Sequence, residues 1–186
     1  MAFIETPNDP ELFEANRAPA GHVPNYVHAF AARPAVYEAW KQLNGAIKES
    51  MDLRRYELAT LAAATALKSS YCSLAHGQVL ADKFYTSEEV AALVDEPPAD
   101  PVDRAVMAFA RKVALAADTI TQADVDELKA VGLSDTDVLD VVLAAAVRCF
   151  FSKTLEATGT PPDAAFNTLP DVLREALTVG RPLHSG

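Results

Sequence analysis

The chain has 186 residues, with 50% hydrophobic and 23% charged, a composition that indicates one globular domain over residues 1–186. Its formal net charge of −10 argues against nucleic acid or an anionic membrane as a partner, because no basic stripe outweighs that charge. No membrane span is predicted, since the most apolar run, residues 138–151, is too short to cross a bilayer. The chain begins without the pattern of a signal sequence, and its two cysteines fit a reducing compartment, so the cytoplasm is the predicted location.

Apolar periodicity predicts three helices in a motif core at about residues 36–84. Pro34 fits the first turn of the first helix, and Asp52 is placed to cap the second. The third helix has Cys72 in its first turn and ends near Phe84. The periodic positions are Val36, Trp40, Leu43, Ile47 and Met51 in the first helix, and Leu58, Leu61, Thr65 and Lys68 in the second.

Helix start signals recur further along the chain, and no alternating β pattern is present, so the fold class is all-α. Prolines in residues 95–101 predict a non-helical linker before a second helical half at about 102–158. The helix over about 135–158 is apolar on nearly all sides at 141–151, so its middle is expected to be buried. The Pro-rich C-terminal tail, 159–186, is expected to form short helices or docked coil. The three capping boxes are Thr86 with Glu89, Thr121 with Asp124, and Ser134 with Asp137.

Three residues in the motif core carry the chemistry of an activated thiol. Cys72 and His76 are four apart on one helix and therefore share a face, which brings the imidazole close to the thiol. Glu57 is a single carboxylate on the preceding Ala-rich helix. If the two helices pack antiparallel, Glu57 can orient the imidazole or relay a proton.

The residues just before the thiol strengthen this interpretation. Ser69 and Ser70 are good N-cap residues, and a cap at Ser69 puts Cys72 at the N3 position. The positive end of the helix dipole stabilises a thiolate there. Taken singly, each chemical group also has a structural interpretation: Cys72 as a small core residue, His76 as a partly buried histidine, and Glu57 as a solvent-facing or ion-paired acid.

The remaining reactive side chains give weaker signals. Cys149 lies in the apolar helix and is expected to be a buried, inert thiol, with a role as resolving thiol for Cys72 as the alternative. Cys72 and His76 have usable spacing for zinc, but no second pair of ligands is near in sequence. No metal and no cofactor is therefore predicted, and there is no Gly-rich phosphate loop.

The segment from Arg55 to Gly77 resembles the core motif of the AhpD-like superfamily, which holds the alkylhydroperoxidase-D and carboxymuconolactone decarboxylase relatives. Glu57, Cys72 and His76 match the Glu, the second Cys and the His of that motif. Later stretches at 103–112, 133–140 and 152–159 resemble the uncharacterised peroxidase-related subgroup, so the resemblance covers roughly residues 20 to 165. It implies an AhpD-like helical bundle with a motif-bearing helical hairpin, assembled as a homo-oligomer (dimer, trimer or hexamer).

The resemblance also implies roles for individual residues. Cys72 would attack a hydroperoxide, with Glu57 and His76 relaying protons, and Tyr71 occupies a position where an aromatic residue or His is usual. Ser69 stands where the family has its first, resolving Cys. The sulfenic acid of Cys72 would therefore need Cys149, another subunit or an external thiol for its reduction.

Three functions follow as hypotheses. The first is a peroxidase-like oxidoreductase, an antioxidant enzyme that takes hydrogen peroxide or an organic hydroperoxide and a thiol reductant. The second is a carboxymuconolactone decarboxylase-like enzyme in which Glu57 and His76 act as acid and base and Cys72 only lines the site. The third is a non-enzymatic oligomeric redox sensor or scaffold.

Overall fold

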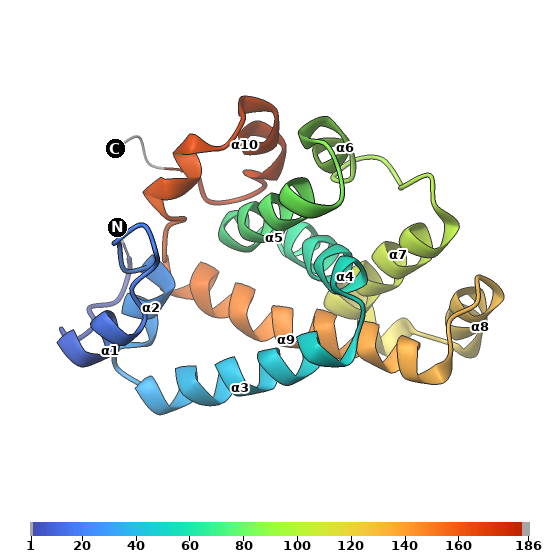
Figure 1. The fold of residues 1–186 in the computed structure, drawn as a ribbon. Coiled ribbons are helices and arrows are strands. Elements are labelled where there is room, and N and C mark those ends of the chain that lie inside the picture. Colours follow the sequence, from blue (N-terminus) through green and yellow to red (C-terminus); the bar gives the residue numbers. More distant parts are fainter. Residues whose placement is uncertain (1, 184–186) are drawn as a thin grey trace.

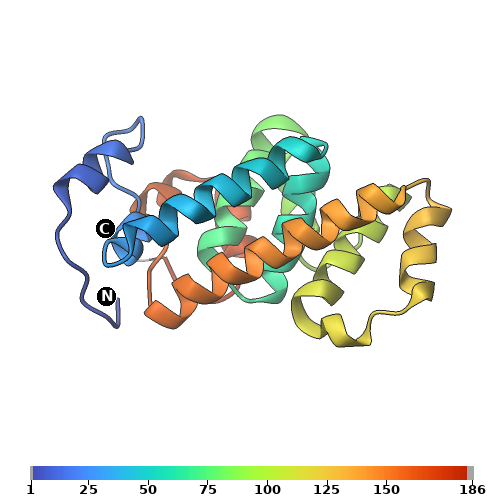
Figure 2. The same cartoon turned by 90° about the horizontal axis from the view of Figure 1, so that it is seen from below.

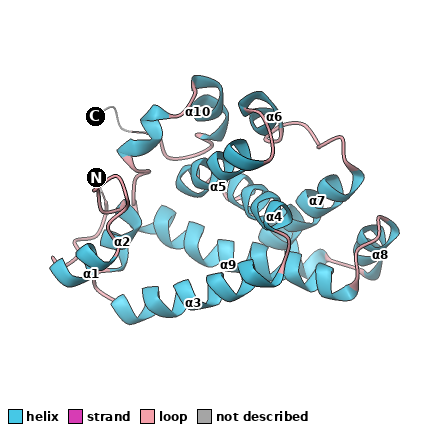
Figure 3. Ribbon diagram, in the orientation of Figure 1, coloured by secondary structure: helices cyan, strands magenta, loops and turns pink. Residues whose placement is uncertain are grey.

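The computed structural model describes residues 2–183, and the chain folds there into helices and connecting loops with no strand among the described residues (Figure 3). The all-α prediction is confirmed. The α-helices are α1 Pro10–Ala15, α2 Asn25–Phe30, α3 Pro34–Ser50, α4 Leu53–Ala66, α5 Ser70–Lys83, α6 Ser87–Ala92, α7 Pro101–Ala116, α8 Gln122–Ala130, α9 Asp135–Thr158 and α10 Asp171–Leu177, and the 3-10 helices are η1 Ala117–Thr119 and η2 Ala164–Thr168.

The predicted start signals cap their helices. The Asp52 carboxylate accepts a hydrogen bond from the backbone N–H of Arg55 at 2.9 Å and opens α4. All three capping boxes form, at the starts of α6, α8 and α9. Gly159 ends α9 in the left-handed conformation, with φ 71°, which a residue with a Cβ adopts at a cost.

Three predicted boundaries are wrong by one to a few residues. Met51 was expected in the first helix, but α3 ends at Ser50 and Met51 is its C-cap residue in an extended conformation. Lys68 was expected within the second helix, but α4 ends at Ala66 and Lys68 lies in the tight turn before α5 with φ 53°. The linker was expected to include Pro101, whereas this proline is the first residue of α7, where its missing N–H costs no hydrogen bond, and Asp100 caps the helix.

Helix α4 lies at the centre of the bundle and packs against α5, α7 and α9 (Figure 1). The short connection over residues 67–69 turns the chain back, so that α4 and α5 form the predicted hairpin. The long helices α3 and α9 lie beside each other along one side of this hairpin (Figure 2). The carboxylate of the motif, its thiol and its imidazole thus lie on two adjoining central helices. Among the described residues, no helix has the length and apolar character needed to cross a bilayer.

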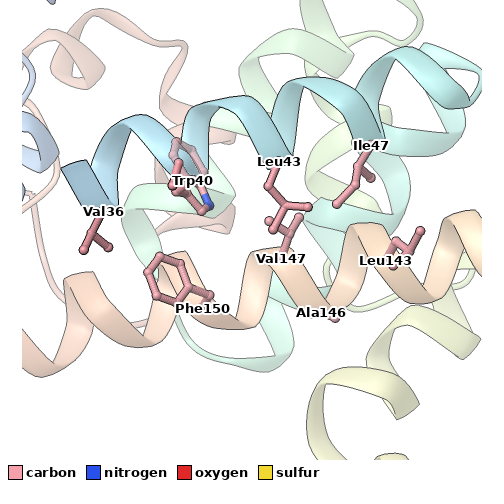
Figure 4. Close-up of a pocket in the computed structure, with 9 residues that line it drawn as sticks. Val36, Trp40, Leu43, Ile47, Leu143, Ala146, Val147 and Phe150 are labelled. Atoms are coloured by element: carbon pink, nitrogen blue, oxygen red, sulfur yellow. The ribbon is translucent and has the colours of Figure 1, made fainter. Parts of the chain in front are cut away.

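A groove of about 420 Å³ between α3 and α9 corrects one prediction of burial (Figure 4). On the α3 side of the groove, Val36 and Leu43 of the apolar stripe are exposed, Leu43 at 55%. The middle of α9 was expected to be buried all round, but Leu143 and Phe150 are exposed. Apolar periodicity gives no indication of which apolar residues of a helix remain uncovered.

The C-terminal segment packs on the thiol helix. The Ser73 hydroxyl donates to the backbone carbonyl of Leu177 at 2.5 Å, and the Gly180 N–H donates to the Ser70 hydroxyl at 2.8 Å. Helix α10 packs against α5 and α6, as expected for a docked tail. The tail therefore covers the face of α5 that is turned away from α9.

Gly77 lies where α5 packs against Leu177 of this tail. A Cβ added there lies 2.3 Å from Cδ1 of the fully buried Leu177, whereas one added at Gly45 in α3 meets nothing within 4 Å. We expect Gly77→Ala to lower the free energy of unfolding by about 1–3 kcal/mol through overpacking. The matched control Gly45→Ala should raise it by roughly 0.5–1 kcal/mol, because alanine favours a helix over glycine. Urea unfolding of both variants measures the difference, and equal stability of the two would contradict this packing.

Candidate functional site

The hairpin brings the carboxylate and the imidazole of the motif into direct contact. His76 Nδ1 lies 2.5 Å from Glu57 Oε2. The other carboxylate oxygen accepts a hydrogen bond from Lys48 Nζ of α3 at 2.9 Å. Glu57 is fully buried, whereas His76 and Lys48 reach the surface in part. Three helices therefore contribute to a Lys48–Glu57–His76 chain that runs from solvent to the interior.

The protonation states in this chain follow from its surroundings. Burial alone would raise the pKa of Glu57, but hydrogen bonds from His76 and Lys48 and the charge of Lys48 outweigh it and lower this pKa. Burial and the positive charge of Arg148 lower the pKa of His76 to about 4 despite Glu57. An ionised carboxylate can only accept, so neutral His76 donates its Nδ1–H to Glu57 and carries an unprotonated Nε2. His76 is thus a base at neutral pH.

The lowered pKa of His76 makes the fold sensitive to acid. The histidine of the unfolded chain takes up its proton near pH 6.5, whereas the folded protein resists protonation until about pH 4. The free energy of unfolding should therefore fall as the pH is lowered, by about 2 kcal/mol between roughly pH 7 and pH 5. Urea unfolding across this range measures the fall, and a His76→Gln variant should show a flatter dependence. An unchanged slope in the variant would contradict a neutral His76 in the folded protein.

Cys72 is the N3 residue of α5, as predicted, and its side chain is buried, with 1% exposed. Its Sγ lies 3.6 Å from Nη1 of Arg148, which comes from α9 and is 4% exposed. Sequence reasoning did not assign Arg148 to the site, because it is 76 residues away along the chain. One signal was present, namely a charged residue within the most apolar helix.

A hydrogen-bond chain holds the other end of this guanidinium. Arg148 Nη2 donates to the Tyr56 hydroxyl at 3.5 Å, and that hydroxyl donates to Asn44 Oδ1 at 2.7 Å. The guanidinium also lies 5.6 Å from the ring centroid of Phe151. Tyr56 precedes Glu57 in α4, so α4 contacts both the His76 side and the Arg148 side of the site.

Three other predicted residues lie away from the thiol's contacts. Ser69 is the N-cap residue of α5 but makes no capping hydrogen bond with its side chain, which is fully buried. The Tyr71 hydroxyl donates to Asp163 of the C-terminal segment. Cys149 is half-buried, with Sγ 3.9 Å from the Ala114 carbonyl of α7, and burial raises its pKa. Both cysteines are free thiols, and within residues 2–183 no group of three or more His, Cys, Asp or Glu side chains is arranged to hold a metal ion.

Sequence comparison matches the part of the chain that contains this site to a known protein family. Residues 34–112 match the Carboxymuconolactone decarboxylase family, a stretch that includes α3, the α4–α5 hairpin and most of α7. This part of the chain is similar to that family. No curated protein matches the sequence.

Solved structures share the fold of this chain. An uncharacterised peroxidase-related protein from Ralstonia eutropha JMP134, described as an alkylhydroperoxidase AhpD core, is 23% identical with a TM-score of 0.76, over 89% of this chain and 94% of that chain. An uncharacterised peroxidase-related protein from Silicibacter sp. TM1040 is 22% identical with a TM-score of 0.79, over 90% and 94%. The AhpD-like fold is therefore confirmed.

The same fold also occurs in a protein with another named activity. The debrominase Bmp8, solved in complex with 2,3,4-tribromopyrrole, is 17% identical with a TM-score of 0.72, over 93% of this chain and 97% of that chain. At such identities the likeness concerns the fold alone. The reaction has to be argued from the side chains of the site.

Proposed function

We propose that this AhpD-like protein is a thiol-dependent peroxidase that reduces hydrogen peroxide or an organic hydroperoxide through Cys72. The observation that carries the proposal is the 2.5 Å contact between Glu57 and His76, one helical turn from the thiol on the same face of α5. A base oriented by a buried carboxylate next to a thiol is the arrangement that nucleophilic thiol catalysis requires.

The first half-reaction uses these three side chains. The unprotonated Nε2 of His76 accepts the thiol proton, and the Cys72 thiolate attacks the terminal oxygen of the hydroperoxide. The O–O bond breaks as the S–O bond forms, so sulfur is oxidised to the sulfenic acid and the peroxide is reduced. The leaving alkoxide or hydroxide takes the proton back through His76 and departs as the alcohol or water. Glu57 keeps the imidazole in the required tautomer throughout.

The second half-reaction takes its electrons from outside the chain. Ser69 replaces the resolving cysteine of the family motif, and Cys149 is directed at the α7 backbone. Two molecules of an external thiol would convert the sulfenic acid to the thiol, with release of one disulfide and one water. The need for an external thiol is consistent with the predicted cytoplasmic location. The homo-oligomer stays a prediction, for which the exposed apolar groove between α3 and α9 is a suitable surface.

Acid–base catalysis is the second candidate, and the buried Glu57–His76 pair favours it independently of the thiol. In a decarboxylase- or lactone-type reaction His76 would abstract a proton and Cys72 would only line the site. The two candidates differ in their dependence on the thiol.

Turnover with excess reductant tests the proposal. Reduced protein is mixed with hydrogen peroxide or an organic hydroperoxide and excess dithiothreitol, and peroxide loss is followed above the uncatalysed rate. We expect many equivalents of peroxide to be consumed per chain. Peroxide consumption that stops at one equivalent per chain would favour the redox sensor. If no peroxide is consumed, the peroxidase proposal is wrong and acid–base catalysis is the remaining candidate reaction.

A further inference from the structure

Arg148 is a buried cation without an acidic partner. Within residues 2–183 it forms no ion pair with a carboxylate, and its polar contacts are Cys72 Sγ and the Tyr56 hydroxyl. Its Nε is buried and has no hydrogen-bond partner. A guanidinium does not lose its proton in a protein, so the positive charge is present in the interior whatever the pH. A buried charge that lacks a counter-charge is strongly destabilising.

The neighbouring groups do not supply that counter-charge. From α4, Glu57 has its two oxygens engaged by Lys48 of α3 and His76 of α5, and the Tyr56 hydroxyl donates a hydrogen bond to Asn44. His76 is neutral, and Arg148 itself helps to hold its pKa low. The remaining group in contact with the guanidinium is Cys72.

We infer that Arg148 is the counter-charge of Cys72 and pairs in the interior with its thiolate, the form that attacks the peroxide. The pair itself follows from the contacts of Arg148, whereas its catalytic consequence rests on the proposed function. Arg148 is then a catalytic residue, because it touches the reacting sulfur and stays beside it while an oxygen atom is added. Tyr56 and Asn44 are positioning residues that hold the guanidinium against the sulfur.

The pair can be tested at equilibrium, without peroxide. The ultraviolet absorbance of the thiolate is recorded against pH in a Cys149→Ser background, with the Cys72→Ser, Cys149→Ser double variant as the blank. Arg148→Met removes the charge and keeps most of the volume, and Arg148→Lys keeps a charge. We expect Arg148→Met to shift the midpoint of thiolate formation upward by about one to three pH units, with a smaller shift for Arg148→Lys.

A matched control separates this contact from a general loss of positive charge. Arg55 pairs with Asp137 between α4 and α9, and Arg55→Met should leave the midpoint unchanged. Circular dichroism establishes that each variant is folded. If the Arg148 variants do not fold, Tyr56→Phe, which keeps the volume and removes the hydroxyl contact, should raise the midpoint by a smaller amount.

The outcomes separate the inference from the proposed function. A midpoint that is the same with and without the Arg148 charge overturns the inference, whether or not peroxide is consumed. If Arg148→Met shifts the midpoint but the protein consumes no peroxide, the ion pair is supported and only the peroxidase proposal is contradicted. In an active protein, Arg148→Met should also slow oxidation of Cys72 by about 10- to 100-fold at neutral pH.

Discussion

Replacing Cys72 with serine is expected to abolish peroxide consumption, with a loss of roughly a thousandfold or more. The sulfur is the atom that accepts the peroxide oxygen, and a serine hydroxyl cannot be oxidised in its place. The substitution suits the site sterically, since Cys72 is buried and serine removes no backbone contact. Steady-state consumption of hydrogen peroxide with excess dithiothreitol measures the loss.

Cys149→Ser is the matched control for this prediction. Cys149 lies one residue after Arg148 in α9 but contacts the Ala114 carbonyl. Because consecutive residues of a helix point in different directions, Arg148 meets the thiol helix while Cys149 meets α7. We expect the control to keep its activity within about twofold. Loss of turnover in Cys149→Ser, with an intramolecular disulfide in the oxidised wild type, would identify Cys149 as the resolving thiol and contradict the requirement for an external one.

The second large effect is expected at the base and its carboxylate. His76→Gln removes the group that moves the proton, and we expect peroxide consumption to fall by about 10²- to 10⁴-fold. Glu57→Gln keeps the shape but replaces the acceptor of the Nδ1–H, so the imidazole loses its orientation and a fall of similar size is expected. The double variant should be little worse than either single one, because the two residues act as a unit.

The same variants separate the two candidate reactions. A peroxidase loses activity on substitution of Cys72 and of His76, whereas an acid–base enzyme loses it for His76 and keeps it for Cys72. Lys48→Met adds a graded control, because Lys48 contacts Glu57 at 2.9 Å but not the imidazole. We expect it to have a smaller effect than Glu57→Gln. If the loss of activity in the double variant equals the product of the losses in Glu57→Gln and His76→Gln, a joint role of Glu57 and His76 is contradicted.

Much of the helical framework could be predicted because its determinants are local. Capping residues such as Asp52 and Ser134 satisfy N–H groups of their own helix, so a few residues of sequence decide where a helix starts. The contact between Glu57 and His76 could also be predicted from the sequence, for a related reason. A short connection between two helices makes them neighbours, and the positions of the two residues along the hairpin bring them together.

The rest depends on long-range packing, which local patterns do not contain. Arg148 reaches Cys72 because α9 crosses the hairpin, and no sequence period reports that crossing. Leu43 and Phe150 have the character of core residues and lie beside a surface groove, since the pattern gives the face of a helix but not what covers it. The contact at Gly77 could not be predicted from local sequence either, because it is made by Leu177, which is far away along the chain.

The chemical state of Cys72 after exposure to peroxide tests its role as the reacting thiol most directly. Reduced protein receives one equivalent of hydrogen peroxide in the presence of a sulfenic-acid trap, and the peptides that contain Cys72 and Cys149 are weighed by mass spectrometry. We expect the trapped adduct on Cys72, little on Cys149, and recovery of the free thiol when dithiothreitol is added instead of the trap. An unmodified Cys72, or one oxidised no faster than Cys149, would contradict this role.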